Sequence, residues 1–91
     1  MANHKSAWKR IRQNAKRRAR NNHYKTFMRN KVKAVRKAVS EGDLEKAQAL
    51  LTGAISALDK VASKGVIHRN KAARTISRLS KAVHNLKANI S

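Results

Sequence analysis

The stretch Ser40-Glu41-Gly42-Asp43 divides the chain and decides its fold. Glycine ends a helix readily, and an aspartate directly after it suits the first position of a new helix, where its carboxylate can accept free backbone N–H groups. A second stop, Lys64-Gly65-Val66-Ile67, follows Lys60, and lysines at this end of a helix interact favourably with its dipole. With no proline and no alternating β-branched runs, the sequence predicts three helices, over roughly residues 6–39, 44–64 and 68–89.

Each expected helix carries one apolar stripe at helical spacing, as a helix in a bundle requires. Short loops make sequential helices antiparallel neighbours, so we predict one all-α domain over residues 1–91, an antiparallel three-helix bundle with a long, projecting N-terminal helix. Gly53 lies inside the second helix, where it is expected to allow close helix packing. The stripes are Tyr24, Met28, Val32, Val35 and Val39; Leu44, Ala47, Leu51, Ala54, Ile55, Leu58, Val61 and Ala62; and Ala72, Ile76, Leu79, Val83, Leu86 and Ile90.

The front of the first helix has almost nothing to bury. Between Ser6 and His23 the only large apolar residues are Trp8 and Ile11. At about 1.5 Å per residue the first helix would exceed the second by roughly 20 Å, so residues 1–20, here called the basic arm, should project past the bundle. An isolated helix of like charges has little to stabilise it, so we expect this arm to be frayed in the free protein.

The distribution of charge points to a polyanionic partner. The first forty residues hold fourteen Lys or Arg and no Asp or Glu, and the whole chain has a net charge of +19. All four acids lie between residues 41 and 59. Consecutive residues of a helix point about 100° apart, so Lys and Arg side chains should surround the arm on all sides. That arrangement suits a groove between RNA stems better than a flat membrane.

A second basic cluster begins the third helix. Arg74, Arg78 and Lys81 recur at steps of four and three and should form one ridge opposite the Ile76–Leu79 seam, with free N–H groups at the helix start adding to anion attraction. Because the third helix starts where the second ends, this cluster and the base of the arm should converge on one end of the bundle. The candidate RNA-binding residues are Asn3, Lys5, Ser6, Lys9, Arg10, Arg12, Lys16, Arg17, Arg18, Arg20, Asn21, Lys25, Lys64, His68, Arg69, Asn70, Lys71, Arg74, Ser77, Arg78 and Lys81.

Enzymes, metalloproteins and membrane-spanning proteins are disfavoured. The four histidines have no metal-ligand spacing, and no cysteine or acid cluster joins them. Paired carboxylates, a glycine-rich phosphate loop and a nucleophile–base pair are all missing, so we predict no catalytic residue, metal or cofactor. No apolar run could cross a membrane and no secretory signal is recognisable, which favours a cytoplasmic location.

Three aromatic residues could stack on bases. Tyr24 and Phe27 fall on or beside the apolar stripe and are expected in the core. Trp8 lies on the bare arm, where the sequence leaves both roles open.

Several motifs resemble the bacterial small-subunit ribosomal protein S20 family, and the resemblance covers nearly the whole chain. Those at the start are Ala2-Asn3, Lys5-Ser6-Ala7, Lys9-Arg10 and Lys16-Arg17-Arg18. The later ones are Ala62, Lys64-Gly65-Val66-Ile67-His68, Asn70-Lys71-Ala72-Ala73-Arg74 and Ser77-Arg78-Leu79, and the specific part among them is the block from Gly65 to Arg74. The resemblance implies a ribosome-bound three-helix protein that binds 16S ribosomal RNA directly and early in assembly of the small ribosomal subunit. It implies a position low on the body, touching the 5′ domain and the penultimate stem. Trp8 stands where the family commonly has a charged or polar residue.

Two other classes compete with this interpretation. A DNA-binding or condensing protein would be favoured by a recognition helix with base-reading Asn or Gln, and none is clear. A membrane-active amphipathic helix would need a broad apolar face, which the arm lacks. We therefore expect 16S ribosomal RNA and the small subunit as partners, with no membrane and no obligate protein dimer.

Overall fold

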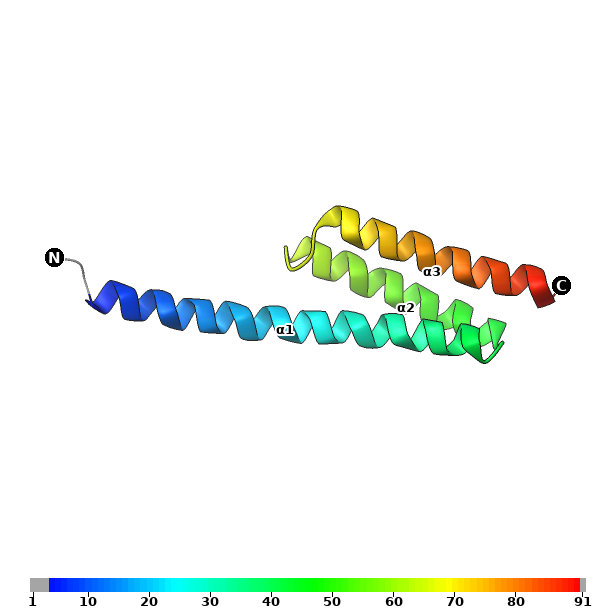
Figure 1. Cartoon of the computed structure of the whole chain (residues 1–91), viewed down its shortest axis with the longest axis horizontal. Coiled ribbons are helices and arrows are strands. Elements are labelled where there is room, and N and C mark those ends of the chain that lie inside the picture. Colours follow the sequence, from blue (N-terminus) through cyan, green and yellow to red (C-terminus); the bar gives the residue numbers. More distant parts are fainter. Residues whose placement is uncertain (1–3, 91) are drawn as a thin grey trace.

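The chain folds into three helices with short connections. The computed structural model describes residues 4–90, with α1 spanning His4–Ser40, α2 Leu44–Ser63 and α3 Arg69–Ile90. Successive helices run antiparallel, and α2 lies between α1 and α3 (Figure 1). The predicted all-α bundle with a long N-terminal helix is confirmed. Among the described residues, no helix is both long and apolar enough to cross a membrane.

The connection between α1 and α2 is short, and Asp43 makes hydrogen bonds to both helices. Gly42 has φ +74°, and its N–H donates to the Val39 carbonyl at 3.1 Å while the Asp43 N–H donates to the Ala38 carbonyl at 3.0 Å. This pair of bonds is the Schellman pattern that satisfies the last carbonyls of a helix. The Asp43 carboxylate then accepts the Lys46 N–H at 3.1 Å, as the sequence predicts for the first residue of α2.

The second turn repeats the glycine motif. Gly65 has φ +75° and donates to the Ala62 carbonyl at 3.0 Å, and Val66 donates to the Val61 carbonyl at 3.2 Å. Ile67 follows and lies buried in the core, only 8% exposed. The connection between α2 and α3 is thus held by backbone bonds and anchored by an apolar side chain.

The core agrees with the predicted stripes except at a few positions. Ala38, Ala57 and Ile67 are buried although they lie outside the stripes. Ile90 was expected in the core but is 57% exposed, because it ends α3 beyond the turn that joins α1 to α2 (Figure 1). The buried residues are Met28, Val32, Val35, Ala38, Ala47, Ala54, Ala57, Leu58, Val61, Ile67, Ala72, Leu79 and Val83.

The front of α1 projects past the bundle, as Figure 1 shows for its blue half. Every residue from 5 to 20 is exposed. The radius of gyration is 18.2 Å, whereas a compact chain of this length would have about 12 Å. The excess reflects a molecule 71 Å long and only 21 by 15 Å across.

The structure differs from the expectation of a frayed arm, since α1 is regular helix from His4 onward. The arm contains no glycine or proline and is rich in Ala, Lys and Arg, which have high helix propensity. It also continues a helix that is already packed, so the unfavourable nucleation step is not repeated. Helix continuity therefore outweighs the mutual repulsion of its charges.

Gly53 has a different environment from the one predicted. A Cβ added there would meet no atom within 4 Å, so the expectation of close helix packing is wrong. Gly53→Ala should raise the free energy of unfolding by about 1 kcal/mol, because alanine costs less backbone entropy in an exposed helix. Urea denaturation measured by circular dichroism checks this.

Gly65→Ala is the matched control. A Cβ added at Gly65 would also meet no atom within 4 Å. The positive φ at this position, however, strains any residue that has a Cβ, so this variant should have a lower free energy of unfolding. Equal effects at the two glycines would contradict the account.

Candidate nucleic-acid interface

The basic arm presents its cations on every side. Its predicted RNA-binding residues from Lys5 to Arg20 are all exposed, and consecutive positions point in different directions around the helix. Asn3 lies outside the described residues. The arm therefore offers charge to a partner that surrounds it, and the described residues here are Lys5, Ser6, Lys9, Arg10, Arg12, Lys16, Arg17, Arg18 and Arg20.

The base of the arm is tied to the turn between α2 and α3. Arg20 Nη2 donates to the Lys64 carbonyl at 3.3 Å, which places a guanidinium at the negative end of α2. A guanidinium has five N–H donors, so Arg20 keeps others for a phosphate. Next to it, Asn21 is half-buried and its Oδ1 has no hydrogen-bond partner among the described residues; Lys25, one turn on, is also half-buried. Arg20 and Lys64, both candidates from the sequence, are thus brought together.

His68 begins α3 in a way the sequence did not suggest. Its Nδ1 accepts the Asn70 N–H at 3.0 Å, and its carbonyl accepts the N–H groups of Lys71 at 3.0 Å and Ala72 at 3.2 Å. The imidazole therefore caps the helix, a task more often done by Ser, Thr, Asp or Asn. Because these amides already have partners, fewer of them are free for an anion than the sequence predicted.

The ridge on α3 is exposed as expected, but it does not gather at one point. Arg69, Asn70 and Lys71 form the start of α3, directly after the turn that holds Lys64. Arg74, Ser77, Arg78 and Lys81 are exposed farther along, opposite Leu79, which is 2% exposed. At about 1.5 Å per residue, Lys81 lies roughly 18 Å beyond Arg69. The candidate residues form an extended strip rather than a pocket, with the Glu41–Glu45 corner at the other end (Figure 1).

A groove between α1 and α3 adds basic residues that the sequence analysis left out. Its apolar floor is formed by Met28, Val32 and Leu58. Bases from both helices line it: Arg29, Lys33 and Arg36 from α1 and Lys71 from α3. The three α1 residues recur at steps of four and three, the same signal that identified the α3 ridge, so spacing alone could have found them.

The aromatic side chains agree with the prediction only in part, because Phe27 was expected in the core but is not packed against it. Tyr24 packs against the core and meets the His23 ring edge-on, with centroids 5.9 Å apart. Phe27 is half-buried and has the ammonium groups of Lys31 and Lys60 each 5.8 Å from its ring centre. Trp8 alone of the three is exposed.

Removing the cap at His68 should destabilise the protein. His68→Ala should lower the free energy of unfolding by about 0.5–2 kcal/mol, the usual cost of losing a helix cap. His68→Asn should keep most of it, because an amide oxygen can accept the same N–H. His84→Ala, at an exposed position of α3, is the control and should change stability by less than about 0.5 kcal/mol. Thermal melts of the three variants check this, and equal melting of His68→Ala and His84→Ala would rule the cap out.

The comparisons with known proteins agree with this geometry. The family model for ribosomal protein S20 matches residues 2–84. The chain belongs to the ribosomal protein S20 family. Its relatives include the small ribosomal subunit protein bS20 of Oleidesulfovibrio alaskensis, 63% identical over 86 residues that cover 94% of this chain and 99% of the relative. The proteins of the same name from Nitratidesulfovibrio vulgaris and Pelobacter propionicus are 61% and 52% identical, over 91% and 94% of this chain and 95% and 99% of theirs.

Membership in the S20 family makes the chain a structural ribosomal protein and not an enzyme. The specific part of the resemblance, residues 65–74, forms most of the turn between α2 and α3 and the start of α3. This is where the arm, the cap and the α3 cluster meet. Among residues 4–90, no three His, Asp or Glu side chains gather in a position to hold a metal ion.

Proposed function

We propose that the protein binds 16S ribosomal RNA directly, as a structural constituent of the small ribosomal subunit that helps the subunit assemble. The observation that carries this proposal is the extended strip of exposed basic residues on the arm, at the Arg20–Lys64 junction and on the ridge of α3. The relatives are named as small-subunit proteins, which supports the subunit as the partner. The chain would act as one RNA-binding domain over residues 1–91, ribosome-bound in the cytoplasm.

The parts of the strip suit different features of a folded RNA. The arm is narrow and carries Lys and Arg side chains on all sides, so it fits between two RNA stems whose phosphates face it from several directions. The ridge on α3 faces one way and suits one phosphate backbone. The groove with Arg29, Lys33, Arg36 and Lys71 is a further candidate for backbone contact. Contacts of this kind position a protein on RNA without reading bases.

Charge also links the protein to assembly. A net charge of +19 on a small chain makes the free protein repel itself, and phosphates would relieve that repulsion. Binding to the folded state stabilises it in turn. The protein would therefore be most stable on RNA, and it would hold separate stems together by neutralising the phosphates between them.

A competition experiment tests this function against general polyanion binding. The protein is bound to labelled 16S ribosomal RNA at moderate salt, and unlabelled 16S RNA or duplex DNA is added at equal nucleotide concentration. We expect the RNA to displace the label and duplex DNA to leave most of it in place, because the strip must match a particular arrangement of stems. Equal displacement by duplex DNA would make the protein a general nucleic-acid binder. Salt dependence alone does not discriminate, since every phosphate binder weakens as salt rises.

A further inference from the structure

We infer that Trp8 stacks on an unpaired base of the bound RNA and that the arm is a base-contacting element as well as a source of charge. This inference rests on the proposed function and adds a specific contact to it. The cations of the arm explain attraction to phosphate, but they do not explain an indole among them.

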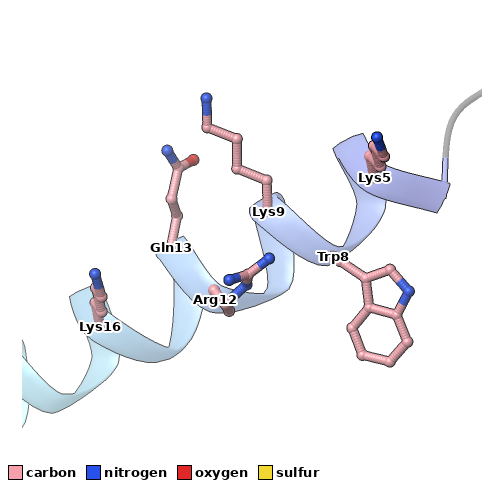
Figure 2. Close-up of a pocket in the computed structure, with 6 residues that line it drawn as sticks. All are labelled: Lys5, Trp8, Lys9, Arg12, Gln13 and Lys16. Carbon is pink, nitrogen blue, oxygen red and sulfur yellow. The ribbon is translucent and has the colours of Figure 1, made fainter.

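The indole is presented outward and has no recorded partner among the residues that the structure describes. Trp8 is 61% exposed, and the neighbouring helical turn carries Ile11, which is 57% exposed. No ring contact involves Trp8 among the described residues, whereas Tyr24 and Phe27 both have one. Figure 2 shows the indole extending away from the helix, on the opposite side from the side chains of Lys9 and Gln13. The exposed indole is therefore available to a partner along most of its surface.

The surroundings of Trp8 determine the kind of partner. Lys5, Arg12 and Lys16 line a shallow surface of the arm together with Trp8, and no carboxylate lies within residues 5–40. An apolar patch surrounded by cations is complementary to a molecule that has both anionic groups and flat aromatic faces. A nucleic acid has both, with phosphates for the amines and guanidinium and a base for the indole.

The stacked base must be unpaired. Bases within a continuous stem are already stacked on both faces, and the grooves of an RNA duplex expose little of those faces. A loop, bulge or junction offers a free face. The helix would hold the indole in one place while the neighbouring cations contact the phosphates on either side, so that the arm recognises a stem next to an unpaired nucleotide.

A membrane or an acidic protein surface fits the patch less well. Stable binding of a helix to a bilayer surface needs a broad apolar face. Trp8 and Ile11 do not provide one, because Lys and Arg side chains surround the arm. An acidic protein would satisfy the cations but would leave the flat face of the indole without a matching surface.

Trp8 is the only tryptophan in the chain, so its fluorescence reports on this one position. We would titrate the whole protein with 16S ribosomal RNA and measure the emission and its quenching by acrylamide, with binding followed separately by filter retention. Stacking should quench most of the emission and reduce access of acrylamide severalfold. Fully paired duplex RNA at the same nucleotide concentration should also bind, but it should quench the Trp8 emission less.

Three variants separate stacking from apolar contact. Trp8→Ala should weaken binding to 16S RNA by about 5- to 150-fold, which corresponds to the usual cost of losing one aromatic–base stack. Trp8→Phe should stay within about threefold of the original, because it keeps a flat ring. Trp8→Leu should lose as much as Trp8→Ala. Circular dichroism checks that each variant remains folded, which the exposure of Trp8 favours.

The outcomes also distinguish this inference from the proposed function. If 16S RNA is retained but the indole stays as bright and as open to acrylamide as in the free protein, the stacking inference is wrong and the function stands. Equal affinities of Trp8→Leu and Trp8→Phe would likewise overturn stacking. If anionic vesicles shield the indole and 16S RNA does not bind at all, the proposed function fails together with the inference.

Discussion

Replacing Arg17 and Arg18 together with Ala should weaken binding to 16S ribosomal RNA by roughly 10- to 30-fold at about 0.15 M salt. Both residues are exposed at the centre of the arm's basic cluster. Each phosphate contact releases about 0.9 of a counterion when the protein binds. Losing two contacts should therefore make the slope of log affinity against log salt shallower by up to about 1.8. Filter binding over a series of salt concentrations measures both quantities.

The same double variant should melt almost normally. Residues 5–20 bury no side chain in the core, so their loss of charge leaves the packing unchanged. Alanine is also a strong helix former and keeps the arm helical. A large fall in melting temperature would mean that the arm packs in the core after all.

A control variant that loses the same two charges elsewhere separates the effect of their position on RNA binding from the effect of total net charge. Lys37→Ala with Lys46→Ala removes the same two charges from exposed positions beside the acidic corner, at the end of the bundle away from the arm. This pair should weaken RNA binding only slightly, because those lysines lie outside the proposed strip. If both double variants lose equal affinity, the RNA responds only to total charge and the arm has no special role.

Leu58→Ala should have the largest effect on stability, a loss of about 2–5 kcal/mol. Leu58 is 1% exposed and lies on the central helix, where it also forms the floor between α1 and α3. Its removal leaves a cavity that none of the three helices can close alone. A domain of this size has only about 5–15 kcal/mol in total, so much of the free protein should unfold near physiological temperature. Thermal and urea denaturation measure the loss.

Ile90→Ala is the matched control for this variant. Ile90 is a large aliphatic residue of the same size, but it is 57% exposed at the end of α3 and should cost little. Added 16S RNA should restore the folded state of Leu58→Ala, because a ligand that binds only the folded state stabilises it. A Leu58→Ala protein as stable as the Ile90→Ala protein would contradict the described core.

Much of the fold could be predicted from local signals. Gly42, Asp43 and Gly65 fix the two turns through bonds between neighbouring residues, and the apolar stripes fix which face of each helix is buried. These features depend on short stretches of chain, so they can be recognised in the sequence. The length difference between α1 and α2 was enough to predict the projecting arm.

Other features depend on what surrounds a residue in space. The capping role of His68 and the open surroundings of Gly53 depend on local geometry that residue type alone does not reveal. Ile90 matched its stripe, yet no neighbouring helix reaches it. The bases Arg29, Lys33 and Arg36 matter as a group only because Lys71 of α3 faces the same groove.

The sequence by itself determined the three helices, their turns and the basic arm, and it predicted a polyanionic partner, because hydrogen-bonded turns, helical periodicity and charge are properties of neighbouring residues. Only the tertiary structure decided that Arg20 joins the arm to the end of α2 and that Trp8 stands exposed among cations. The physical reason is that burial and contact between residues as distant in the chain as Arg20 and Lys64 depend on how the helices pack.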